Sequence, residues 1–258
     1  MIEPDREQLL GQIVSRELEI TRRIASHVVP VASGFVALHE KYPASHDNNV
    51  LEVTQWHGTR EIVRDVDRVF GAAGLRYRHI HIRDESLALR LASGFIEMGF
   101  EQSVRLVMVF TEDRCNEIPW KVDRVPYETM ARDVEQAWRR ALPKASEEEI
   151  RQLVERRLAR EAVCDMSYHA ICQDNRYVSR CEVSRYGGIA LIDGVVTDPE
   201  WQRRGFARSV VLDAVELSKA SGCSIVWLET ERDDWPQQFY RRLGFSEIGL
   251  IHGYWKRE

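Results

Sequence analysis

The sequence predicts a mixed α/β protein built from two copies of one fold. Helical spacing of apolar residues alternates with short strand-like runs along the 258 residues. Two stretches, VRDVDRVFGAAGLRYRHIHIRDESLALRLASGFIEMGFEQ and LDAVELSKASGCSIVWLETERDDWPQQFYRRLGFSE, share the order helix, Gly turn, strand, acidic turn, helix, Gly-Phe, strand. Glycines end elements at corresponding positions of the two stretches, Gly74 with Gly222 and Gly99 with Gly244, which indicates an internal repeat.

The length also favours two domains, because a single domain averages roughly 150 residues. Between 113 and 125 the chain has little periodicity, which is typical of a connection between domains. We therefore predict a first domain over 1–115 and a second over 116–258.

In the first half, apolar residues at helical spacing predict a helix over 5–26. The runs GFVALHEK and NVLEVTQ then read as strands joined by a loop rich in Pro, Asp and Asn. Helical spacing returns at Thr59 and stops at Gly71 and Gly74. A strand, LRYRHIHI, a helix from about Ser86 to Glu97 and a strand around VRLVMVF complete this half.

The second half begins with two charged helices, over about 127–141 and 146–162. Ser146 with Glu149 fits a capping box at the start of the second. YHAICQ, RYVSRCEVSRY and GIALIDGVVT follow as strands with turn residues between them. The remaining order is helix (206–220), strand (224–230), helix (235–242) and strand (246–256).

Composition narrows the function classes. The net charge of −5 argues against nucleic acid as a partner. No apolar stretch approaches the roughly 20 residues that a membrane span requires, and the acidic start MIEPDREQ lacks the features of a secretory signal. The five cysteines are never arranged as C-x-x-C, so reduced thiols are expected rather than disulfides or a zinc site. We expect a cytoplasmic protein, monomeric or homodimeric.

The stretch VTDPEWQRRGFAR carries the strongest functional signal. A strand ends at Thr197, Pro199 starts a turn, and Gly205 stands where an amphipathic helix begins. Free N–H groups and the positive end of the helix dipole converge at such a start, which favours anions. Gly205 and Ala207 leave room for a diphosphate near the backbone. Arg203 and Arg204 add charge that can pair with phosphate.

The spacing Gln202, Gly205, Ala207 resembles the pyrophosphate loop of the GNAT acetyltransferase superfamily. A second signature of that family, F-Y-x-x-x-G-F, is present as Phe239, Tyr240, Gly244 and Phe245. The resemblance covers roughly residues 165–256, and the first half is similar to a degenerate copy without the loop. It implies tandem domains, each with a central, mostly antiparallel sheet flanked by helices. It also implies acetyl-CoA as co-substrate.

The resemblance further implies site residues. The backbone of Val195, Val196 and Thr197 is expected to hold the pantetheine arm, and Tyr240 to protonate the departing thiolate. Phe95, at the matching place in the first copy, has no hydroxyl, so we expect that copy to be non-catalytic and without cofactor. The residues expected to hold the diphosphate are Gln202, Arg203, Arg204, Gly205, Phe206, Ala207 and Arg208.

An amine acceptor is mostly protonated at neutral pH, so the reaction needs a base or a water chain. Asp193, which by strand alternation shares a face with Leu191 and Val195, is one candidate. Glu229 on the next strand is the other, and the residues do not choose between them. His79 and His81 have metal-ligand spacing on a strand, but no third ligand is identifiable, so two half-buried histidines and no metal are expected.

The predicted function is transfer of an acetyl or longer acyl group from coenzyme A to a small-molecule or peptide amine. The alternative is a non-catalytic acyl-CoA sensor or interaction module that keeps the loop and has lost the chemistry. Tyr240 favours the enzyme. The sequence does not name the acceptor, because fold alone does not determine a substrate.

Overall fold

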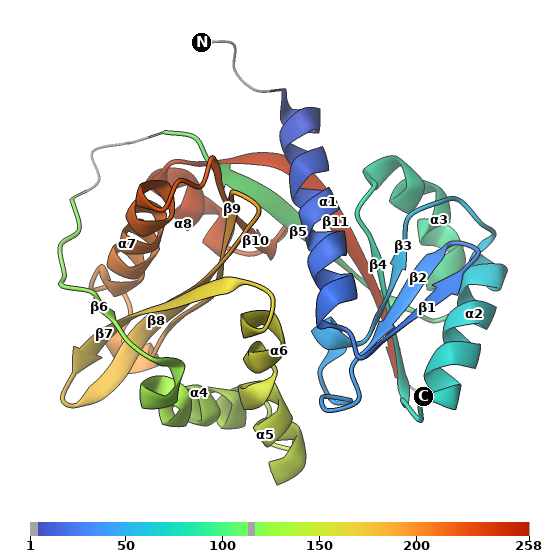
Figure 1. Cartoon of the computed structure of the whole chain (residues 1–258), viewed down its shortest axis with the longest axis horizontal. Coiled ribbons are helices and arrows are strands. Elements are labelled where there is room, and N and C mark those ends of the chain that lie inside the picture. Colours follow the sequence, from blue (N-terminus) through green and yellow to red (C-terminus); the bar gives the residue numbers. More distant parts are fainter. Residues whose placement is uncertain (1–4, 113–116, 258) are drawn as a thin grey trace. The chain divides into compact units, whose positions relative to one another are not determined.

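A computed structural model describes residues 5–112 and 117–257 (Figure 1). The chain divides into two compact units. The first comprises 1–107, 230–234 and 248–258, and the second comprises 108–229 and 235–247. The strands β5 (Glu101–Phe110), β10 (Ile225–Glu231) and β11 (Phe245–Arg257) contribute residues to both.

The first unit is a sheet with helices on both faces. Its strands run in the order β1-β2-β3-β4-β11, and neighbours are antiparallel except β3 and β4, which are parallel. Its elements are α1 (Arg6–Ile24), β1 (His27–Val31), β2 (Gly34–Leu38), the 3-10 turn η1 (His46–Asn48), β3 (Val50–Val53), α2 (Thr59–Ala72), β4 (Tyr77–Ile82) and α3 (Glu85–Glu97).

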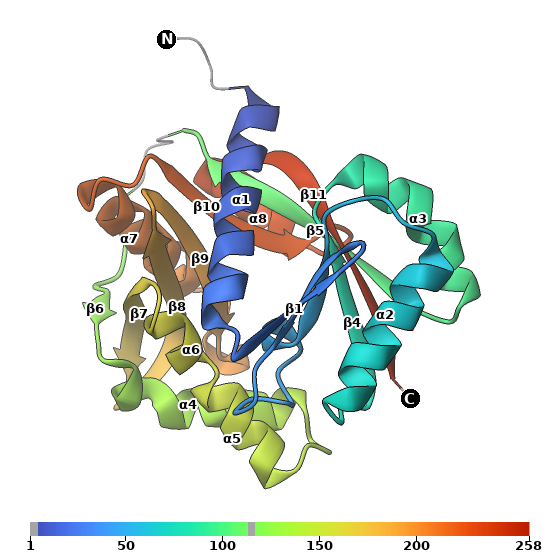
Figure 2. The same cartoon turned by 45° about the vertical axis from the view of Figure 1, so that its right-hand side comes forward.

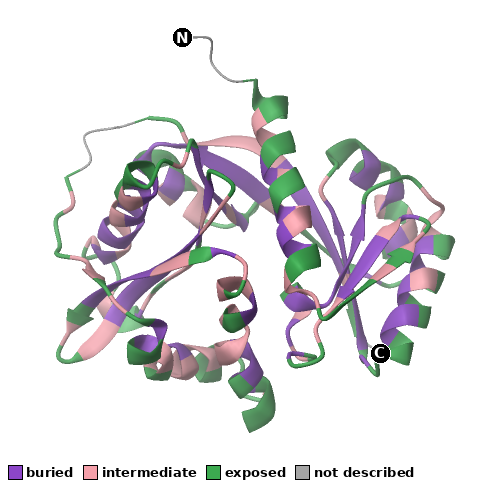
Figure 3. Ribbon diagram, viewed as in Figure 1, coloured by how far each residue is buried: buried purple, intermediate pink, exposed green. Residues whose placement is uncertain are grey.

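Side chains alternate between the two faces of these strands, so each face packs against different helices. Leu51 and Val53 of β3 pack with Ile80 of β4 into the core formed with α2 and α3. Val50 points the other way and, with Phe35 and Ala37, packs against Leu18 of α1. Figure 3 shows the buried residues gathered along the sheet and on the inner sides of these helices.

The second unit has the strand order β10-β9-β8-β7-β6, with only β9 and β10 parallel. Its elements are β6 (Asp123–Arg124), α4 (Tyr127–Ala141), α5 (Glu147–Glu155), α6 (Arg157–Glu161), β7 (Asp165–Gln173), β8 (Arg176–Tyr186), β9 (Ile189–Thr197), the 3-10 turn η2 (Pro199–Trp201), α7 (Phe206–Ala220) and α8 (Pro236–Leu243).

The two faces of this second sheet carry different helices, as Figure 2 shows. On one face, Cys181 of β8 donates a hydrogen bond to the Val210 carbonyl of α7 (3.4 Å). On the other, Tyr127 and Met130 of α4 pack with Tyr168 of β7. Helix α7 is therefore held against the strands that lead into the loop at its start.

Most predicted elements are confirmed, and the repeat appears as α2-β4-α3-β5 matching α7-β10-α8-β11. The Ser146–Glu149 capping box is present. The predicted helix over 146–162 is instead two helices, divided at Arg156. Strand β1 was not predicted, and Pro30 within it obscures the strand pattern.

The predicted boundary at 115/116 falls within residues 113–116, which lie outside the described part of the chain. The division into compact units differs from the predicted domains at three places, the first being that residues from 108 onward already belong to the second unit. Residues 230–234 and 248–258 belong to the first unit, because the last part of β11 pairs with β4. The assignment of 116–258 to a single functional domain stays a prediction.

Candidate functional site

The loop between β9 and α7 has the geometry of an anion-binding helix start. Gly205 is the N-cap with φ +85° and has no side chain with which to cap the helix, whose first turn holds no acidic residue. Arg203 also has a positive φ, +61°. A Cβ added to Gly205 would meet its nearest atom at 3.7 Å, so glycine is needed there for the left-handed backbone rather than for space. An N-cap glycine offers no side-chain acceptor to the N–H groups of the first turn, which is the arrangement that favours an anion at a helix start.

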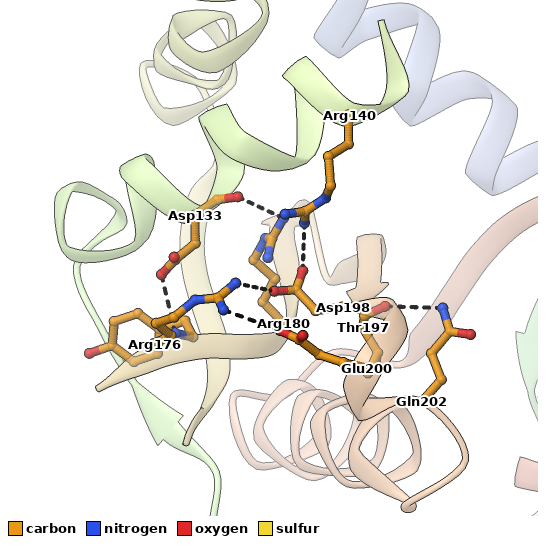
Figure 4. A network of polar contacts seen from close by, with 9 residues as sticks. Asp133, Arg140, Arg176, Arg180, Thr197, Asp198, Glu200 and Gln202 are labelled. Atoms are coloured by element: carbon orange, nitrogen blue, oxygen red, sulfur yellow. Dashed lines mark hydrogen bonds and ion pairs between the residues drawn. The ribbon is translucent and has the colours of Figure 1, made fainter. Parts of the chain in front are cut away.

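Asp198 holds the beginning of this loop (Figure 4). Its carboxylate is 3% exposed and accepts hydrogen bonds from Arg140 of α4 (2.7 Å) and Arg176 of β8 (2.9 Å). The Gln202 side chain donates to the Thr197 carbonyl (3.2 Å). A buried carboxylate with two arginines is electrostatically compensated, so it fixes the path of the chain from β9 into η2.

The same network contains Arg180, whose side chain is almost fully buried. Its Nη2 lies 3.5 Å from the Asp133 carbonyl of α4, and the Asp133 carboxylate accepts from the Tyr177 amide (3.1 Å). A hollow of about 340 Å³ is lined in part by Arg176, Trp201 and Arg204. The Arg204 guanidinium stacks 4.6 Å from the Trp201 ring centre.

Strand β9 carries a bulge just before the loop. Glu182 of β8 is opposite Asp193 and Arg180 is opposite Val196, so β9 has one extra residue in this interval. Gly194, with φ +60°, supplies the left-handed position. The bulge breaks the alternation used to place Val195 on the face of Asp193, so that shared face does not follow from the sequence.

Strands β9 and β10 pair over only part of their length. The parallel ladder joins Ile189–Leu191 to 225–227, while β9 continues to Thr197 and β10 to Glu231. The predicted pantetheine-contacting segment, 195–197, lies in this part of β9 beyond the ladder. Val196 is 37% exposed, and the other two residues are half-buried.

Tyr240 lies on α8, with its ring against Phe239 and Phe245 and 8% of its surface exposed. Burial raises the pKa of the Tyr240 phenol above its usual value of 10, and the neighbouring Cys181 and Asp193 raise it further. The structure thus brings Asp193 within electrostatic range of Tyr240. The phenol stays protonated at neutral pH, as a proton donor must.

Of the two predicted bases, Asp193 is exposed and accepts a hydrogen bond from the Gly194 amide (2.7 Å), and Glu229 is half-buried on β10. Sequence reasoning did not single out Glu182, which is 9% exposed and forms an ion pair with Arg157 of α6. Arg157 also donates to the Tyr127 hydroxyl (3.2 Å). The signal for Glu182 was a lone acidic residue in the strand RYVSRCEVSRY, which otherwise carries three arginines.

The histidine pair of the first unit forms internal contacts. The His79 and His81 rings lie 4.4 Å apart, and His79 Nδ1 is 2.9 Å from the His46 carbonyl. Burial lowers the pKa of His79 to about 3. Within 5–112 and 117–257, no group of three or more His, Cys, Asp or Glu side chains is placed to hold a metal ion. In the same ranges, no helix has the length and apolar character of a membrane span.

Helix α7 thus begins at a left-handed glycine, and the strand that leads into it is bulged and only partly paired. Residues 128–245 match the profile of the Acetyltransferase (GNAT) family. The chain therefore carries a GNAT domain over these residues, and the resemblance stated from the sequence is confirmed.

Individual relatives agree with this assignment. Glucosamine 6-phosphate N-acetyltransferase of Trypanosoma brucei brucei is 36% identical over 61 residues, which are 23% of this chain and 40% of that protein. The chain thus spans less than half the length of this curated relative.

Two solved structures share the fold across nearly the whole chain. A GCN5-related N-acetyltransferase from Kribbella flavida superposes with a TM-score of 0.61 at 16% identity, covering 96% of this chain and 95% of the other. A tandem GNAT protein from the clavulanic acid biosynthesis pathway superposes with a TM-score of 0.57 at 14% identity, covering 97% and 95%. The predicted fold class, two tandem GNAT-like domains with mostly antiparallel sheets flanked by helices, is confirmed.

Proposed function

We propose that the second unit transfers an acetyl group from acetyl-CoA to an amine by direct attack of the amine on the thioester. The observation that carries the proposal is the start of α7, where a left-handed Gly205 leaves the first-turn N–H groups without a side-chain cap. A diphosphate is the part of coenzyme A that such a site recognises. Arg203, Arg204 and Gln202 add donors around it.

The reaction assigns one role to each remaining residue. The pantetheine arm lies along the backbone of 195–197, beyond the β9–β10 ladder. The amine nitrogen bonds to the thioester carbon, and the C–S bond breaks. Tyr240 gives its proton to the departing sulfur, and Asp193 or Glu229 takes the amine proton through water. Burial raises the pKa of Tyr240, so its phenol carries the proton at neutral pH when the sulfur departs.

The first unit takes no part in binding the coenzyme in this proposal. The acceptor is an amine of a small molecule or peptide. The Trypanosoma relative acts, by its name, on an amino sugar phosphate, and an amino sugar is therefore a first compound to include in a screen.

The test is the thermal midpoint of the protein with and without coenzyme A, for wild type and Gly205→Val. A ligand at 100 times its Kd stabilises the native state by about 2.7 kcal/mol, so the wild-type midpoint rises. Valine at φ +85° is strained and moves the loop, so Gly205→Val shows no rise.

Gly222→Val is the matched control. Gly222 has φ +83° at the far end of α7, and an added Cβ would meet no atom within 4 Å. Gly222→Val imposes the same backbone strain away from the loop, so its thermal midpoint still rises with coenzyme A. Absence of a rise in wild type at millimolar coenzyme A would overturn the proposal. If coenzyme A raises the midpoint but no amine of a panel is acetylated, the alternative function, a non-catalytic acyl-CoA sensor, is favoured.

A further inference from the structure

We propose that Trp120 is a positioning residue for the diphosphate loop, fixing the direction in which the Gly205 N–H points. The inference rests on the proposed function and concerns the segment 117–122, which precedes α4. This segment is distant in sequence from the loop but belongs to the same unit.

Three contacts attach Trp120 to the start of α7. Its indole Nε1 donates a hydrogen bond to the Arg204 carbonyl (2.8 Å), and its backbone N–H donates to Ser209 Oγ (3.2 Å). Its ring packs edge-on against Phe206, with centroids 4.7 Å apart. Pro119 and Trp120 also supply the nearest atoms to the place of a Cβ on Gly205, at 3.7 Å. The segment is thus in van der Waals contact with the loop.

The indole hydrogen bond determines the orientation of one peptide group. Cis peptide bonds are absent from the described residues, and in a trans peptide the C=O and N–H point in opposite directions. Because the Arg204 carbonyl points to Trp120, the N–H of Gly205 points away from it. That N–H is one of the donors expected to meet the diphosphate.

The orientation needs such an anchor because Gly205 has little conformational preference of its own. Glycine adopts φ values of either sign at similar cost, so the Arg204–Gly205 peptide could rotate with little penalty. On its far side, the Gly205 carbonyl is already fixed by the Ser209 amide (3.1 Å). Trp120 supplies the missing constraint on the near side and preorganises the loop for an anion.

The test compares coenzyme A with pantetheine, which lacks the diphosphate, as ligands of the full chain in calorimetric titrations. Trp120→Phe keeps a ring against Phe206 and removes the indole donor. We expect the Kd for coenzyme A to rise about fivefold, the effect of losing one net hydrogen bond. The Kd for pantetheine stays unchanged, because pantetheine does not reach the loop.

Trp138→Phe is the matched control, since Trp138 lies on α4 in the same unit, against Arg156 rather than the loop. It leaves both affinities unchanged. If Trp120→Phe lowers the unfolding midpoint, both Kd values are measured well below that midpoint, and Ser209→Ala tests the second attachment, since Ser209 Oγ accepts from the Trp120 N–H and donates to the Gly205 carbonyl (3.3 Å). Ser209→Ala weakens coenzyme A binding in the same direction by a smaller factor.

An unchanged Kd for coenzyme A in Trp120→Phe would overturn the inference. An equal rise in the Kd values of coenzyme A and pantetheine would overturn it too, because it indicates a general loss of structure rather than a change at the loop. These outcomes are distinct from failure of the proposed function, in which the wild-type chain itself does not bind coenzyme A.

Discussion

Two helix starts occupy matching places in the two copies and present opposite chemistry to a ligand. At the start of α2, Glu61 folds back and accepts a hydrogen bond from the Gly58 N–H (3.1 Å). At the start of α7, the corresponding third position is Arg208, and no side chain caps the helix. A carboxylate over the first copy repels phosphate, whereas the second copy leaves its donors and dipole available.

The strands before these two helices also differ, in how far their parallel pairing extends. In the first copy the parallel ladder runs to the last residues of both strands, Val53 of β3 and Ile82 of β4. In the second, the ladder ends at Leu191 and Trp227, well before either strand ends. If the proposed function holds, three local features distinguish the copy with a coenzyme site from the copy without one: a cap, a bulge and the length of one parallel ladder.

The largest effect, on kcat, is expected when the predicted proton donor of the second copy is replaced by the residue found in the first. Tyr240→Phe reproduces Phe95, and we expect kcat to fall about 100-fold with little change in KM for acetyl-CoA, as for loss of a general acid. Steady-state turnover with a responsive amine measures this. Because the Tyr240 pKa is raised above 10, the phenol stays protonated below that pH. The wild-type rate should therefore rise with pH as the amine deprotonates, without an alkaline fall below pH 10.

Phe95→Tyr is the counterpart in the first copy. Phe95 is fully buried, so a hydroxyl there costs stability and adds no turnover. Equal kcat for Tyr240→Phe and wild type would remove Tyr240 from its proposed role.

The next effect concerns the third position of α7. Arg208→Glu places a carboxylate where α2 has Glu61, and we expect the Kd for coenzyme A to rise on the order of 30-fold. The carboxylate competes for the first-turn N–H groups and repels the diphosphate. Titration calorimetry measures the change, and Arg208→Gln separates loss of the positive charge from addition of the negative one. A weakening no greater for glutamate than for glutamine would show that capping does not distinguish the copies.

How much of this could be predicted from sequence depends on the range of the interactions. The helix at Phe206 and its glycine start were predictable, because a helix beginning and a left-handed position are local features of a few residues. Trp120 was not, because its hydrogen bond to Arg204 joins segments 84 residues apart. The same holds for Arg157 with Glu182, 25 residues apart on a helix and a strand.

The bulge at Gly194 could have been predicted locally, but the sequence analysis interpreted the stretch GIALIDGVVT only as a strand. Glycine inside a strand pattern is typical of a bulge or a close backbone approach. The positive φ of Gly194 confirms that physical reason. The pairing of His252–Arg257 with β4 could not be predicted, since pairing between segments far apart in the chain leaves no pattern in either strand alone.

The smallest effect is expected from removing the cap of the first copy. Glu61→Ala deletes one charged hydrogen bond at the α2 start, so we expect the free energy of unfolding to fall by about 0.5 kcal/mol. Coenzyme A binding should keep its wild-type Kd and a stoichiometry of one per chain. The complete β3–β4 ladder leaves no unpaired strand segment like that of β9, so uncapping the helix does not restore a site. Denaturant unfolding gives the first quantity and calorimetric titration the second. A second equivalent of bound coenzyme A in Glu61→Ala would mean that the cap alone silences the first copy, and that the strand ladder is irrelevant to the difference.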